Sequence, residues 1–418
     1  MATDVPHTDR GGDADVAPDM VDHFLPAPVD DLHVAPLLDR IEAQAESADR
    51  TRRVAPDVVA AIKDNDFMRS TATREIGGVE DSMHRVGREL AAIAERCPSL
   101  AWTLWNHVCV FHLFAGSLGP DHADFLTDIV EAREWVSFPA GAGSGVRGRL
   151  DGDRAVLNGK ATWSTGAQYG DWCGVVFAVV GDDGEAVRPL DLRFTMIRNH
   201  ADGVKIDPTW DGGGLRASAT DDIHYTDASV GLDRCVAWFG ANRAESLRVV
   251  PVINHRYRED WVGLSDLWLG WMAVAVVRRA VREAAESFRT RRAIMGTKMQ
   301  IRPTVQLNVG RALALTSAAH AAVVQATAEV DQRIERQQVP DAADYFRQQA
   351  VISMAVEQLG DAMELLARTH GGNGTREGGA FERRLRDFRT MPLHINVHPD
   401  RITHQLGRLA LGIELDPF

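Results

Sequence analysis

The segment Arg386-Asp387-Phe388-Arg389-Thr390-Met391-Pro392-Leu393-His394-Ile395 decides the fold of this chain. It follows the glycine-rich turn His370-Gly371-Gly372-Asn373-Gly374 and a short polar segment. The pair His394-Ile395 indicates which side chain of this segment could transfer a proton. An aliphatic side chain cannot take a proton, whereas an imidazole can exchange one near neutral pH.

The composition excludes several classes of protein. A chain of 418 residues that is 45% hydrophobic buries a large core and is expected to divide into two or three lobes. The net charge of −13 argues against binding to nucleic acid or to anionic membranes. The longest apolar run, 267–277, is too short to span a bilayer, and the N-terminus has no apolar leader. We therefore expect a soluble, cytoplasmic protein.

The four cysteines are scattered, without the regular spacing of a metal site or a disulfide framework. We expect all four to be free and most of them to be buried. The sequence His394-x3-His398 has the spacing of two metal ligands on one helical face, but Pro399 interrupts that helix and no ligating carboxylate is evident. No metal is therefore expected.

The pattern of apolar residues divides the chain into four regions. Residues 1–30 are rich in Asp, Pro and Gly and are expected to form a flexible tail. Residues 31–133 have helical spacing, residues 134–240 alternate between Asp-Gly turns as β-strands do, and residues 241–418 return to long helices. In the last region we expect a bundle of four helices. Their expected ranges are 259–292, 303–335, 341–369 and 394–412.

Three further segments carry recognisable chemistry. Ala161-Thr162-Trp163-Ser164-Thr165-Gly166 offers an aromatic wall and small polar groups, and Trp210–Thr220 combines glycines with Arg216, Ser218 and Thr220. Cys97-Pro98-Ser99-Leu100-Ala101-Trp102 starts a helix that continues to His107 and His112. The alternative interpretations are a core aromatic at Trp163 and a plain glycine-rich hairpin at the second segment.

A fourth segment, 143–148, matches the dinucleotide fingerprint G-x-G-x-x-G. That motif works only when a helix follows it. Here the following residues, Arg149-Leu150-Asp151-Gly152-Asp153, predict a hairpin instead. We therefore expect no nicotinamide site in this chain.

In this order, the segments resemble the acyl-CoA dehydrogenase superfamily, in which many members carry a catalytic glutamate at the position of Ile395. The chain resembles more closely the flavin-dependent monooxygenases that share this fold, several of which have a histidine near the flavin seven residues after the Arg-Asp aspartate, as His394 follows Asp387. The resemblance implies a helix that begins near Arg386 and an α+β multidomain fold. Its parts are an N-terminal α-helical domain, a central antiparallel β domain and a C-terminal four-helix bundle.

The resemblance also implies roles for single residues. Thr165 would hydrogen-bond the N5/O4 edge of the flavin, Trp163 would pack against its ring, and His394 or His107 would steady the peroxide or the substrate's proton. The implied catalytic residues are His394, Thr165 and His107. The implied cofactor-binding residues are Trp163, Ser164, Thr165, Gly166, Arg216, Ser218, Thr220, Arg292, Gly371, Gly372 and Gly374. The implied substrate-binding residues are Trp102, His107, His112 and His398.

The function implied is a monooxygenase that acts on an aromatic, polyketide or amine metabolite through a flavin C4a-hydroperoxide. It would use molecular oxygen and reduced FMN or FAD supplied by a separate NAD(P)H:flavin reductase, and it would form a homo-oligomer, expected to be a tetramer. Two alternatives stay open. One is an acyl-CoA dehydrogenase or oxidase with a base relocated to Glu259 or Asp260, and the other is a flavin-free partner subunit. His394 itself could be a satisfied core histidine.

Overall fold

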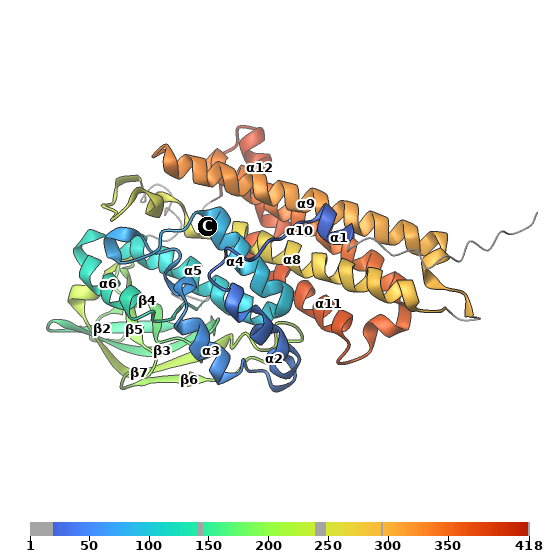
Figure 1. Cartoon of the computed structure of the whole chain (residues 1–418). Helices are drawn as coiled ribbons and strands as arrows, with labels where there is room; N and C mark the ends of the chain where they lie inside the picture. Colours follow the sequence, from blue (N-terminus) through green and yellow to red (C-terminus); the bar gives the residue numbers. More distant parts are fainter. Residues whose placement is uncertain (1–19, 140–144, 239–247, 294–295, 417–418) are drawn as a thin grey trace, which may run out of the picture.

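The computed structural model describes residues 20–139, 145–238, 248–293 and 296–416. Figure 1 shows the N-terminal helices above a β-sheet, and three long helices side by side on the other side of the molecule. The helices are α1 (Met20–Phe24), α2 (Leu38–Thr51), α3 (Pro56–Lys63), α4 (Met83–Arg96), α5 (Pro98–Leu118), α6 (Ala123–Glu131), α8 (Trp261–Thr290), α9 (Pro303–Glu335), α10 (Ala342–His370), α11 (Ala380–Thr390) and α12 (Pro399–Ala410).

Helix α5 occupies the centre of the fold. Pro98 stands in its first turn, where a missing N–H costs nothing, and nearly every side chain along it is buried. It packs against α4, α8 and strand β1 (Val136–Ser137). Helix α5 is apolar and buried on all sides, as expected of a helix in the core. Through its contacts with β1 and α8, it joins the sheet to the long helices.

The sheet lies between residues 136 and 237. Its order is β6-β7-β3-β2-β4-β5-β8, with β1 paired to β4. Most pairs are antiparallel as expected, but β2 and β1 each run parallel to β4. The remaining strands are β2 (Val146–Asp151), β3 (Arg154–Ser164), β4 (Trp172–Val180), β5 (Leu192–Arg198), β6 (Val204–Asp207), β7 (Asp221–Gly231) and β8 (Val236–Ala237).

The hairpin expected after the G-x-G-x-x-G segment is confirmed. β2 and β3 pair antiparallel, with Asp151 opposite Arg154 across the turn. The two residues at the start of that motif, 143 and 144, lie outside the described residues.

The expected α+β architecture is confirmed, and α8, α9 and α10 correspond to three of the four predicted helices. The fourth starts later than predicted, at Pro399 instead of residue 394. Residues 391–397 form two short 3₁₀ turns, because proline favours the first turn of a helix and disfavours helix in the residue before it. The helix expected to begin near Arg386 begins at Ala380, so Arg386 and Asp387 stand inside α11.

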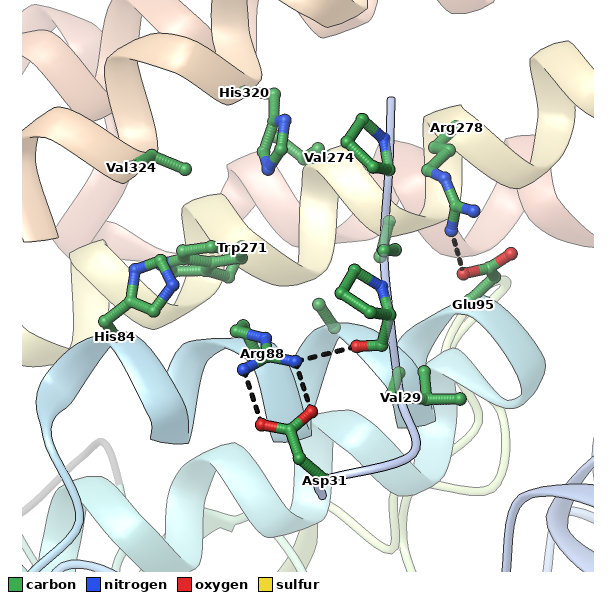
Figure 2. Close-up of a pocket in the computed structure, with 16 residues that line it drawn as sticks. Val29, Asp31, His84, Arg88, Glu95, Trp271, Val274, Arg278, His320 and Val324 are labelled. Carbon is green, nitrogen blue, oxygen red and sulfur yellow. Dashed lines mark hydrogen bonds and ion pairs between the residues drawn. The ribbon is translucent and has the colours of Figure 1, made fainter. Parts of the chain in front are cut away.

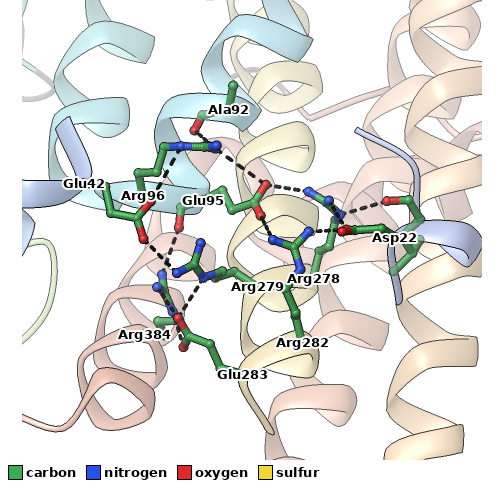
Figure 3. A network of polar contacts seen from close by, with 11 residues as sticks. Asp22, Glu42, Ala92, Glu95, Arg96, Arg278, Arg279, Arg282, Glu283 and Arg384 are labelled. Atoms are coloured by element: carbon green, nitrogen blue, oxygen red, sulfur yellow. Dashed lines mark hydrogen bonds and ion pairs between the residues drawn. The ribbon is translucent and has the colours of Figure 1, made fainter. Parts of the chain in front are cut away.

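The expected flexible tail is ordered over its last part. Residues 20–24 form α1, and both Val21 and Leu25 are buried in the main core. Asp22 pairs with Arg278 (2.6 Å between Oδ1 and Nη2) and with Arg282 on α8 (Figure 3). The composition of residues 1–30 hides this, because the partners of these residues lie far along the chain.

The four cysteines are free, and three of them are buried, as predicted. One helix among the described residues, α9, is long and apolar enough to cross a membrane by length and composition alone. Only 22% of its most apolar stretch is buried, although one side packs against α8 and α10.

Candidate functional site

Three hydroxyls predicted to contact a flavin form one hydrogen-bonded chain. Thr165 Oγ1 lies 3.1 Å from Thr220 Oγ1, which lies 2.8 Å from Ser218 Oγ. The backbone joins the same two segments, since the N–H of Gly166 donates to the carbonyl of Ser218 at 3.0 Å. The turn after β3 and the segment before β7 therefore present their small polar groups together.

Trp163 stands on a β-bulge at the end of β3. The register with β7 shifts between Ala161 and Ser164, and Trp163 has a φ of +66°. Its indole is 57% exposed and meets the ring of Trp210 edge-on, with 5.8 Å between the centroids. The core-aromatic alternative is therefore wrong, and the two rings form an open aromatic wall.

Ser164 does not face the same way as Trp163. Its side chain is fully buried, and its hydroxyl lies 3.8 Å from the Sγ of Cys173 inside the sheet. Successive residues of a strand point to opposite faces. The expected contact of the Ser164 side chain with a cofactor is therefore not supported.

The guanidinium of Arg216 has an unused donor. Its Nε is buried and has no hydrogen-bond partner in the part of the chain that the structure describes, and Nη1 lies 3.8 Å from Asp49. With Arg52 and Arg53, Arg216 lines a cavity of about 130 Å³ beside Trp210. Forked donors next to an aromatic wall suit a phosphate joined to a ring system, so these residues fit a flavin nucleotide.

The glycine-rich segment is locked to α11. The N–H of Leu215 donates to Oδ1 of Asp387 at 2.6 Å, and Arg386 donates to the carbonyl of Gly213 at 2.6 Å. A Cβ at Gly214 would lie 2.2 Å from the carbonyl oxygen of Arg386, so only glycine fits there. Burial raises the pKa of Asp387 to about 7. The Arg-Asp pair therefore anchors the glycine-rich segment to α11.

His394 lies against two tryptophans of α5. Its ring centroid is 5.7 Å from that of Trp102 and 5.0 Å from that of Trp105, and both contacts are edge-on. The backbone N–H of Asn396 donates to Nδ1 of His394 at 3.3 Å. Because Nδ1 accepts, the neutral ring carries its proton on Nε2, and within the described ranges no hydrogen bond to that nitrogen is found.

Burial lowers the pKa of His394 to about 4, so its ring is neutral at pH 7. The expectation of proton exchange by this imidazole near neutral pH is therefore not supported, because the surrounding tryptophans disfavour the charged form. What His394 can offer is an uncommitted Nε2–H donor in an aromatic environment.

One stretch of α5 connects the hydroxyl chain with the histidine. Ser99 accepts from the N–H of Ala217 at 3.3 Å, and Thr103 lies 3.5 Å from where a Cβ on Gly166 would stand. Trp102 and Trp105, which hold His394, belong to the same two turns. The candidate site is therefore built where the sheet, α5 and the segment before α12 meet.

Comparison with known proteins shows which proteins this chain is similar to. Residues 267–399 match the family model described as acyl-CoA dehydrogenase, C-terminal domain. The chain is 24% identical over 407 residues to the pigment production hydroxylase of Rhodococcus sp. (strain ATCC 21145), covering 91% of this chain and 98% of that protein. It is 22% identical to the oxygenase subunit HsaA, a flavin-dependent monooxygenase of Rhodococcus jostii (strain RHA1), covering 66% of this chain and 70% of that protein.

The chain therefore resembles the flavin-dependent monooxygenases of the acyl-CoA dehydrogenase superfamily. Its fold is similar to that of XiaF from Streptomyces sp. in complex with FADH2 and glycerol, with a TM-score of 0.81 at 19% identity. That likeness covers 92% of this chain and 95% of that chain.

His107 is a structural histidine. Its Nδ1 accepts from the N–H of Val136 at 3.1 Å, and its Nε2 lies 3.1 Å from the carbonyl of Met68. Both nitrogens are thus used by backbone groups inside the core, and the expected roles of His107 in catalysis and substrate binding are wrong. His112 is also fully buried, with Nε2 2.9 Å from the carbonyl of Glu259, so the expected contact with substrate is not supported.

The two carboxylates considered for a relocated base are both committed elsewhere. Glu259 is buried and binds Arg333 through both oxygens, at 2.9 and 2.8 Å. Asp260 caps α8 by accepting from the N–H of Val262 at 2.8 Å. The structure therefore disfavours an acyl-CoA dehydrogenase with its base at either position.

No contact between the remaining predicted residues and the hydroxyl chain is found in the described part of the chain. Arg292 donates to the carbonyl of Gly296 at 2.7 Å beyond the end of α8, and the turn 371–375 is mostly exposed. His398 precedes α12 outside any α-helix, so it does not share a helical face with His394. Among the described residues no group of three potential metal ligands is found.

Trp135 is a site residue that the sequence reasoning missed. It is fully buried, and its Nε1 has no hydrogen-bond partner in the described part of the chain. That nitrogen lies 3.5 Å from where a Cβ on Gly166 would stand. A buried indole N–H beside the Thr165 turn is a donor available to a ligand, and no local sequence signal marks it.

His107 gives a prediction about stability against pH. Burial lowers its pKa to about 4, whereas an unfolded histidine titrates at about 6.5. Between these values the unfolded chain binds the extra proton, so the free energy of unfolding must fall as the pH is lowered. His107→Gln should reduce that pH dependence by up to about 1.4 kcal/mol per pH unit, measured by urea unfolding from pH 4.5 to 7.5. An unchanged slope would contradict this assignment.

Proposed function

We propose that this protein is the oxygenase component of a two-component system, and that it hydroxylates an aromatic, polyketide or amine metabolite. Reduced FMN or FAD from a separate NAD(P)H:flavin reductase supplies two electrons, so that one atom of molecular oxygen enters the substrate and the other leaves as water. The protein works in the cytoplasm. The observation that best supports this proposal is that α5 joins the Thr165–Thr220–Ser218 hydroxyl chain to His394. The site therefore has a neutral histidine in place of a glutamate.

Each group of the chain has a task in this proposal. Trp163 gives the flavin ring a wall, Arg216 binds the phosphate, and the hydroxyl of Thr165 binds the polar edge of the ring. His394 donates from Nε2 to an oxygen of the substrate or of bound dioxygen. Trp102 and Trp105 keep water away from that hydrogen bond, which strengthens it.

Turnover with isotopically labelled oxygen tests the proposal. The purified chain is mixed with reduced FMN or FAD, a panel of phenols and aromatic amines, and ¹⁸O₂, and the products are analysed by mass spectrometry. We expect one ¹⁸O atom in an oxygenated product, and only when the chain is present. Oxidation of an acyl-CoA thioester, or failure to bind either flavin, would instead favour the two alternatives.

We further propose a homotetramer. The outer side of α9 presents apolar residues such as Leu307, which is 50% exposed, and the glycine-rich turn 371–375 is mostly exposed as well. An apolar face of this length is costly in water and is expected to be covered by another copy of the chain. Light scattering at micromolar concentration should therefore give four times the 45.9 kDa of one chain.

A matched pair of variants locates the interface. Leu307→Glu places a charge on α9 and should lower the measured mass, whereas Leu190→Glu changes a leucine of similar exposure (52%) beyond the bundle and should not. A wild-type monomer that retains full activity would rule out the tetramer.

A further inference from the structure

A cavity of about 520 Å³ lies between α4, α8, α9 and the segment 26–31, which we call the strap. Trp271 forms much of its wall, packed so closely on Gly87 that a Cβ there would lie 2.5 Å from the indole. Val274, Ala275 and Val324 add aliphatic surface. The volume and the apolar lining are those of a site for a small molecule.

The cavity is separate from the candidate flavin site. Ser265 faces α5, because its carbonyl accepts from the Trp105 indole at 2.8 Å. Val274, nine residues later, lines the cavity, and at about 100° per residue the two positions lie on opposite sides of α8. The body of α8 therefore stands between the cavity and the flavin site.

Two histidines provide unused polar groups in this cavity. His84 and His320 both meet Trp271 edge-on, with ring centroids 5.1 and 5.7 Å from that of the indole. Figure 2 shows the two imidazoles on either side of Trp271. No hydrogen bond to either imidazole is found in residues 20–139, 145–238, 248–293 and 296–416. Burial lowers the pKa of both rings, so both are neutral donors and acceptors at pH 7.

The charged groups at the rim neutralise one another and hold the strap in place. Arg88 binds both oxygens of Asp31, at 2.9 and 2.6 Å, and also the carbonyl of Pro28 at 2.8 Å (Figure 2). Arg278 binds Glu95 and the carbonyl of Leu25 (Figure 3). Because the arginines are paired with carboxylates, the cavity offers no free charge to an anion, and a neutral ligand fits best.

We propose that this cavity is a second small-molecule site, which binds a neutral aromatic compound whose hydroxyl or carbonyl group hydrogen-bonds to His84 or His320. The aromatic part lies against Trp271 and the aliphatic wall, where ring contacts favour it. The ligand touches the strap, α4, α8 and α9 at once, and binding therefore stabilises the folded chain.

Calorimetric titration with 1-naphthol tests this site directly. The wild-type protein should show saturable binding and a higher melting temperature with the probe. Val324→Trp adds a ring from the half-buried wall of the cavity and should weaken binding at least tenfold. Val309→Trp, the same change at a half-buried position of α9 outside the cavity, should leave binding unchanged.

A second variant tests the same cavity by removing its polar groups, without adding a bulky side chain. The double change His84→Leu and His320→Leu removes the polar groups and should weaken binding about tenfold, the effect of one lost hydrogen bond. Absence of saturable binding by the wild type overturns the proposal. So does equal binding by wild type and Val324→Trp, which would place the probe at the flavin site. A change in oligomeric mass in Val324→Trp without probe binding to wild type would show that a second copy occupies the cavity.

Discussion

His394→Ala is expected to fold and assemble normally but to lose turnover by about 10²–10³-fold, with reduced flavin consumed to form hydrogen peroxide. The physical reason is the loss of the Nε2–H donor, since Nδ1 is held by the N–H of Asn396 and the ring is fixed by Trp102 and Trp105. Product and peroxide are measured together, per molecule of folded protein.

Two further variants separate the donor from the packing of the ring. His394→Phe keeps an aromatic ring between the tryptophans but has no donor, and should be as inactive as His394→Ala. His394→Gln offers an N–H near the position of Nε2 and should retain more turnover than either. Because the pKa is about 4, the pH profile of the wild type should show no loss near pH 6.5 from this residue. Reduced stability with normal turnover in His394→Ala would make it a core histidine.

Thr165→Ala is expected to leave flavin bound but to increase peroxide release by about ten- to a hundredfold, the effect of one lost buried hydrogen bond of about 1–3 kcal/mol. Removal of this hydroxyl also leaves Thr220 without the partner at 3.1 Å. The measurement is the ratio of product formed to reduced flavin consumed.

Thr165→Ser keeps the hydroxyl and should keep the ratio near that of wild type, whereas Thr165→Val keeps the shape and should behave like Thr165→Ala. If the ratio is unchanged in both Thr165→Ala and Thr165→Val, the hydroxyl of Thr165 does not contact the flavin.

The sequence predicted the parts of the fold that local pattern determines. Glycines at 212–214 and the Arg386-Asp387 pair could be recognised as motifs, and the structure joins them through the N–H of Leu215 and the carboxylate of Asp387. The hydroxyls of Thr165, Ser218 and Thr220 were likewise grouped correctly, because each stands beside a strand end that the sheet brings together.

Other features depend on residues far apart in the sequence. His107 could be identified as structural only after Met68 and Val136 were placed at its two nitrogens. The neutral state of His394 follows from burial beside Trp102 and Trp105, almost 300 positions earlier in the chain. Trp135 carries no motif, and only the three-dimensional structure shows that its N–H has no partner among the described residues.

Rapid mixing of the protein and reduced flavin with oxygen, in the absence of substrate, tests the central claim most directly. If the site holds reduced flavin and controls its reaction with oxygen, the absorbance of oxidised flavin should return more slowly than in free solution, and peroxide should appear with the same delay. Reoxidation at the rate of free flavin would contradict the monooxygenase assignment, as would reduction of a bound flavin by an acyl-CoA thioester.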